Sequence, residues 1–165
     1  MSALTTQARL TATAIVNGQP VVREVNTLGK IKLGEKPKLL VALEPYDKDA
    51  TNFVERSITD KPLEITIAPG QSIPAWLKVK RSGHDDLITF TVESLPHGVI
   101  VDNIGLNGVL IPKGEDRRQI FLTAAKWVPE IDRLCFAEAK QADNPTSVPV
   151  LLHVRKAGLQ TSQSP

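Results

Sequence analysis

The chain has 165 residues, of which 41% are apolar and 23% are charged. This composition predicts one domain, or one domain plus a fragment of another, with a real apolar core, and it argues against wholesale disorder. The chain has twenty Lys and Arg and eighteen Asp and Glu, which gives a formal net charge of +2. Positive and negative residues are interspersed, so the sequence has no basic stripe of the kind that contacts phosphates. We therefore do not expect nucleic acid as a partner.

The cysteine count and the chain's start limit the class further. Cys135 is the single cysteine, which excludes an intramolecular disulfide and a zinc site built on several cysteines. The first residues lack the basic and apolar regions of a signal peptide, and no uncharged apolar stretch approaches the ~18 residues of a membrane span. We therefore expect no membrane span.

The first predicted elements, in chain order, are strands. Apolar residues at alternate positions from Leu10 to Val16 lead into the turn 17–20 and a second apolar run at 21–25, a strong hairpin signal. A further pair of strands is expected around 29–33 and 38–43. Residues 8–44 thus supply three or four strands, too few to bury their own apolar faces. Either they end a preceding β-domain or they complete the sandwich that follows, and in both cases a partner surface must cover them.

Residues 46–61 are polar and without a clear period, so we interpret them as a linker. Asp47, Asp49, Asn52 and Glu55 superficially suggest a calcium loop. The pattern fails, because Thr51 and Asn52 stand where an EF-hand needs an oxygen ligand and a glycine. A solvated linker is the preferred reading, and a linker calcium ion is the lesser alternative.

The remainder of the chain alternates between apolar and polar residues in short runs separated by turns. The predicted strands are 63–67, 73–79, 88–92, 118–125, 133–140 and 148–154, with further short apolar pieces at 99–101 and 109–111. The first two are expected to form a hairpin-like pair. The run 133–140 fits a strand or a short helix, and we prefer the strand. About seven short strands without a long helix predict an all-β fold, an immunoglobulin-like Greek-key β-sandwich over 62–156, with a small open barrel as the competing fold.

Three turn segments, 92–99, 102–108 and 123–129, carry a resemblance to a known family. They resemble the immunoglobulin-like domains repeated toward the C-terminal end of large secreted bacterial multidomain proteins, and the hairpin 14–22 resembles the end of the preceding domain in such arrays. The resemblance implies an extracytoplasmic, non-enzymatic module that belongs to a longer chain. The predicted organisation is N-terminal strands and linker over 1–61, the sandwich over 62–156, and a disordered tail over 157–165.

The alternation within 73–79 sets Trp76 on the face opposite the core, beside Lys78 and Lys80. An outward Trp buries a large area on binding at a low cost in side-chain entropy. These three residues are the candidate interaction surface, for a neighbouring domain or another protein, or alternatively for a polysaccharide. The alternative is that Trp76 is not exposed, because the strand register breaks there or because the N-terminal segment covers the ring. Trp127, at a strand end, is expected in the core.

No catalytic or cofactor-binding residue is predicted. A cysteine nucleophile would be Cys135 with His84, His97 or His153, but a mid-strand thiol is by default buried and inert. The histidines have no metal-site spacing, so no metal and no cofactor are expected. The function predicted from the sequence is a non-enzymatic structural or protein-interaction module, with carbohydrate binding as the alternative and a hydrolase as a distant third.

Overall fold

The computed structural model describes residues 9–27, 35–102 and 109–156, with the side chains at 9, 10 and 25–27 left out. The described residues form strands, turns and irregular connections, and they contain no helix that could cross a membrane. The chain divides into two compact units between Lys36 and Pro37. Each unit is described by itself.

The first unit holds an antiparallel hairpin of β1 (Arg9–Val16) and β2 (Gln19–Thr27). The turn residues Asn17 and Gly18 have φ values of 51° and 79°, the left-handed conformation that a tight hairpin turn requires and that Asn and Gly adopt most easily. The predicted hairpin is confirmed. Of its apolar side chains, Ile15 is 76% and Val22 is 61% exposed. The strand expected around 29–33 lies outside the described residues.

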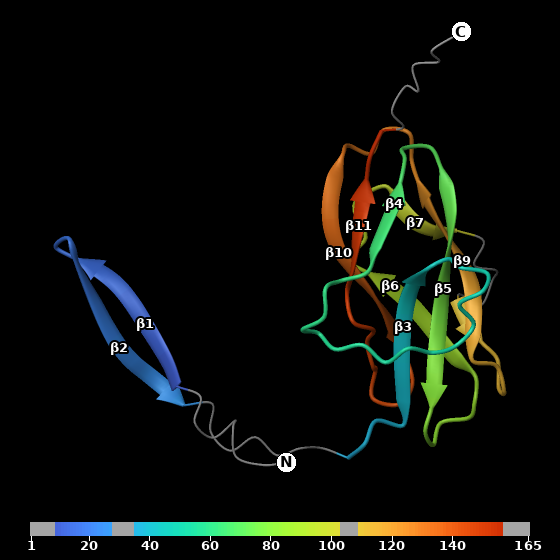
Figure 1. Ribbon diagram of the computed structural model, residues 1–165, viewed down its shortest axis with the longest axis horizontal. Coiled ribbons are helices and arrows are strands. Elements are labelled where there is room, and N and C mark those ends of the chain that lie inside the picture. Colours follow the sequence, from blue (N-terminus) through green and yellow to red (C-terminus); the bar gives the residue numbers. More distant parts are fainter. Residues whose placement is uncertain (1–8, 28–34, 103–108, 157–165) are drawn as a thin grey trace, which may run out of the picture. The chain divides into compact units, whose positions relative to one another are not determined.

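The second unit is a sandwich of two sheets (Figure 1). One sheet has the order β3-β5-β9-β7, formed by β3 (Leu39–Pro45), β5 (Ser72–Arg81), β9 (Arg117–Ala124) and β7 (Val99–Asp102). The other has the order β4-β11-β10-β6-β8, formed by β4 (Glu64–Ile67), β11 (Val150–Val154), β10 (Ile131–Ala139), β6 (Ile88–Glu93) and β8 (Val109–Ile111). The fold is therefore the predicted all-β, immunoglobulin-like sandwich.

The core lies between the two sheets and uses alternate residues of each strand, because successive side chains of a strand point to opposite faces. In β5, Ala75, Leu77 and Val79 are buried, and in β11, Val150, Leu152 and Val154 are buried. The remaining strands contribute the following buried apolar residues: Leu39, Val41, Leu43, Ile65, Ile67, Ile88, Phe90, Val99, Val109, Ile111, Ile120, Leu122, Ala124, Cys135, Ala137 and Ala139. The strand preferred over 133–140 is confirmed by β10.

Strand β3 pairs along its length with β5 and so belongs to the sandwich, which is one of the two arrangements left open for the N-terminal strands. The division between the two units lies at 36/37, whereas the sequence predicted a boundary at 61/62. The predicted hairpin of 63–67 with 73–79 is wrong, since β4 pairs in parallel with β11 while β5 lies in the opposite sheet between β3 and β9. The turn at 68–71 carries the chain from one sheet to the other. The loop 103–108 and the tail 157–165 lie outside the described residues.

Candidate interaction surfaces

The face of β5 that carries Trp76 is covered by residues 46–56, here called the strap. The Trp76 ring stacks on Tyr46 with centroids 5.2 Å apart, and its indole Nε1 donates a hydrogen bond of 2.9 Å to the carbonyl oxygen of Asp47. The guanidinium of Arg117 lies 5.8 Å from the Trp76 ring centroid and donates a hydrogen bond of 2.9 Å to the carbonyl oxygen of Thr51. Trp76 is therefore half-buried and helps to hold the strap against β5 through its contacts with Tyr46 and Asp47.

Lys78 lies beneath the strap and is 1% exposed, so the exposure expected for it is wrong. Its Nζ lies 2.7 Å from Glu44 Oε2 on β3 and donates to the carbonyl oxygens of Ala50 at 2.7 Å and Asn52 at 3.0 Å. A buried ammonium is tolerated only when it is paired and hydrogen-bonded, and the strap supplies those partners. Alternation fixed the face on which Lys78 lies but not the segment that covers that face.

Lys80 is the member of the predicted trio that remains on the surface. It is exposed, and its Nζ lies 3.5 Å from Glu55 Oε2 of the strap. The carbonyl oxygens of Ala50 and Asn52, in the segment considered for calcium, face the Lys78 ammonium. Among the described residues no group of three or more His, Cys, Asp or Glu could hold a metal ion.

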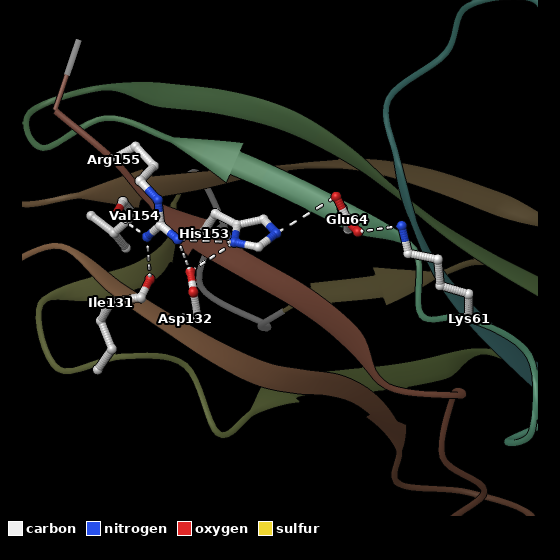
Figure 2. Close-up of polar contacts among 7 residues, drawn as sticks. All are labelled: Lys61, Glu64, Ile131, Asp132, His153, Val154 and Arg155. Atoms are coloured by element: carbon white, nitrogen blue, oxygen red, sulfur yellow. Dashed lines mark hydrogen bonds and ion pairs between the residues drawn. The ribbon is translucent and has the colours of Figure 1, made fainter. Parts of the chain in front are cut away.

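The outer face of the other sheet carries a polar network that links three strands (Figure 2). The His153 ring on β11 lies between two carboxylates, with Nδ1 at 2.7 Å from Asp132 Oδ1 on β10 and Nε2 at 3.7 Å from Glu64 Oε2 on β4. Arg155 also contacts Asp132 Oδ1 and donates to the carbonyl oxygen of Val154 at 2.9 Å. The network therefore ties the edge strand β4 to β11 and β10.

The carboxylates of this network are held in their charged form. The pKa of Asp132 is lowered, first by its hydrogen bond with His153 and then by that with Arg155. The pKa of Glu64 is lowered mainly by the hydrogen bond and charge of Lys61, whose Nζ lies 2.9 Å from Glu64 Oε1, with a smaller contribution from His153. Hydrogen bonds and positive neighbours favour the ionised carboxylate.

Next to this network the same face exposes apolar side chains. Leu134 on β10 is 49% exposed and pairs in register with half-buried Leu151 on β11. Phe136, two residues along β10, is also half-buried and lies opposite Glu93 of β6. We call Leu134, Phe136 and Leu151 the docking face. The run 133–140 has no clean alternation, so the sequence alone did not show that Leu134 and Phe136 point outward. The pairing of β10 with β11 brings Leu134 beside Leu151.

Trp127 was expected in the core and is instead 61% exposed, so that prediction is wrong. It follows the end of β9 in the connection 125–130, where strand alternation no longer decides which side chain points inward. Its neighbour Val128 takes the buried position at 3% exposed. The ring lies 5.2 Å from that of His97, centroid to centroid, at an interplanar angle of 50°.

The thiol of Cys135 points into the core and is 0% exposed, and burial raises its pKa to about 11. His153 lies on the opposite, outer face of the same sheet, so the two do not form a nucleophile and base. A cavity of about 150 Å³ lies beside β3, lined also by residues 53–56, Leu63, Thr146 and residues 148–150. Its volume is below the ~300 Å³ at which small-molecule sites usually begin.

Comparison with known proteins assigns no family to this chain. No family model matches the chain, and no curated protein matches it. Among solved structures, the ASH / PapD-like domain of human CEP192 (PapD-like domain 7) is 11% identical, with a TM-score of 0.37, over 81% of this chain and 96% of that one.

Proposed function

We propose that this chain is a non-catalytic protein-interaction module, one β-sandwich of a larger bacterial extracytoplasmic protein, and that it binds a neighbouring domain or another protein through the docking face. The observation that carries the proposal is the outward position of Leu134 at 49% exposure, beside Leu151 and Phe136, on the outer face of a sheet. The turn segments at 92–99 and 123–129 support the extracytoplasmic setting through their resemblance to secreted bacterial domains.

The chemistry around the docking face fits a protein partner. A protein interface combines an apolar centre with a polar rim, and the energy is concentrated in a few large side chains. Leu134 and its neighbours supply the centre, while Asp132, His153 and Arg155 supply polar groups already fixed by mutual hydrogen bonds. Fixed side chains lose little further entropy on binding, which favours affinity.

Carbohydrate binding at Trp76 has less support. A sugar stacks on an aromatic ring whose face is open, but Tyr46 stacks on the Trp76 ring and Arg117 lies near it. The strap would have to leave before a polysaccharide could reach that ring.

The experiment is site-specific photo-crosslinking in the full chain. A benzophenone amino acid replaces Leu134 in one variant and Leu87, an exposed leucine at 45%, in the matched control. Each variant is irradiated with the secreted and envelope protein fraction of the source organism, and a panel of polysaccharides is tested in parallel. We expect a discrete protein adduct at position 134 that position 87 does not give. Equal adducts at both positions, or polysaccharide binding that Trp76→Ala abolishes, would contradict the proposal.

A further inference from the structure

A second surface lies at one end of the sandwich, separate from the docking face. It is an open hollow of about 390 Å³, here called the end hollow, formed by the turn 68–71, the connection 126–129 and Lys156, the second residue after β11. Its lining residues are Ala68, Pro69, Gln71, Lys126, Trp127, Val128, Pro129 and Lys156. Three connections far apart in sequence thus meet around one exposed tryptophan.

Trp127 is exposed, yet its position is fixed by the backbone beside it. A methyl group at Gly98 would lie 2.5 Å from Trp127 Cη2 and 2.7 Å from Val128 Cγ2, so only glycine leaves room for the ring, and its φ of +88° suits glycine. The turn beneath is closed by hydrogen bonds from Ala125 N to Gly98 O at 2.8 Å and from Val128 N to Ala125 O at 3.1 Å. A tryptophan held in this way is the kind of side chain that anchors an interface.

The charge of the end hollow has one sign. Lys126 and Lys156 line it, no Asp or Glu does, and within the described part of the chain neither lysine is paired with a carboxylate. One carboxylate lies close by, outside the lining: Glu130 Oε1 accepts a hydrogen bond of 2.9 Å from the backbone N–H of Lys156. The lining of the hollow therefore offers a flat aromatic ring and two lysines that form no ion pair with the described carboxylates.

We propose that the end hollow binds an acidic, extended segment of a partner protein, with an apolar side chain against Trp127 and carboxylates on Lys126 and Lys156. Charge complementarity selects this occupant. The chain's own residues 157–165 contain no Asp or Glu, so they offer no carboxylate side chain. The proposal goes beyond the docking face and does not depend on it.

The test is fluorescence anisotropy of the full chain with a fluorescein-labelled peptide in which glutamates surround two leucines. The control peptide has glutamine in place of glutamate. We expect Trp127→Ala to weaken binding about tenfold and the double variant Lys126→Gln/Lys156→Gln about five- to tenfold. The matched control, Lys48→Gln/Lys113→Gln, removes two lysines exposed elsewhere and should change the Kd less than about twofold.

Thermal melts by circular dichroism establish that every variant is folded. The proposal is overturned if the glutamine peptide binds equally well, if the two lysine pairs weaken binding equally, or if Trp127→Ala has no effect. It is also overturned if an RNA oligonucleotide or an anionic polysaccharide binds more tightly than the acidic peptide in a manner that depends on Trp127, because the hollow would then serve another class of ligand.

Discussion

The substitution Lys78→Met tests whether the buried ion pair holds the strap on the sandwich. Methionine keeps most of the length and apolar volume of lysine but has no charge and no donor. In the wild-type chain Lys78 Nζ donates hydrogen bonds to Glu44 Oε2 at 2.7 Å, to Ala50 O at 2.7 Å and to Asn52 O at 3.0 Å. The variant leaves a carboxylate and two carbonyl oxygens without that donor.

The expected loss is large because the Lys78 and Glu44 side chains are only 2% and 11% exposed. Removing one partner of a buried pair typically costs about 3–5 kcal/mol, since the other charge stays buried and unpaired. Against a total stability of about 5–15 kcal/mol for a domain, this lowers the melting temperature by roughly 10 °C or more. The double variant Lys78→Met/Glu44→Leu should recover much of the loss, because it removes the stranded carboxylate as well.

The assay combines urea unfolding, followed by far-UV circular dichroism, with limited trypsin digestion. Lys48 and Arg56 lie in the strap and provide cleavage sites, which should be cut faster in Lys78→Met. The matched control is Lys80→Met, an exposed lysine on the same strand, for which we expect a change within about 0.5 kcal/mol. If Lys78→Met is as stable and as protease-resistant as Lys80→Met, the reasoning about the strap is refuted.

Three further predictions follow from buried or fixed side chains. A thiol reagent at pH 8 should label native Cys135 slowly, because the thiol is buried and its pKa is about 11; rapid labelling of the native protein would contradict this. The substitution Cys135→Ala should lower the free energy of unfolding in urea by roughly 1–3 kcal/mol. The pKa values of Asp132 and Glu64 are lowered in the fold, so the stabilisation from these carboxylates is present at neutral pH and is lost as pH falls below their unfolded pKa values of about 4. The urea midpoint should therefore drop toward pH 3, and this drop should be smaller in the double variant Asp132→Asn/Glu64→Gln. Gly98→Ala should destabilise the sandwich by roughly 1–3 kcal/mol and shift the emission of Trp127, whose ring occupies the space of a methyl group; an unchanged spectrum and melting temperature would contradict that contact.

Local alternation predicted most of the strands of the sandwich, because a strand with one buried face repeats every two residues regardless of its partner. Ile65 and Ile67 were expected on one face and are buried in β4. Alternation does not show which strand a given strand pairs with. The alternation of 63–67 is the same whether it pairs with β5 or β11, so the parallel pairing with β11 could not be inferred from it.

The candidate sites were predicted less well for related reasons. Lys78 was placed correctly on the outer side of β5, but the sequence of the strap gave no sign that its carbonyl oxygens would surround the ammonium. Trp127 lies past the end of β9, where the period of two no longer applies, and Val128 takes the inward position. The network of Asp132, His153 and Arg155 depends on the register of β10 against β11, which tertiary packing sets.

The most direct measurement of the central claim, that the sandwich binds a protein through its docking face, is the affinity of the full chain for the partner found by crosslinking. Isothermal titration calorimetry compares wild type with Leu134→Asp and with Leu87→Asp, two leucines of similar exposure at 49% and 45%. The proposal predicts that Leu134→Asp weakens binding at least about tenfold, while Leu87→Asp stays within about twofold. Equal affinities for both variants and the wild type would contradict it.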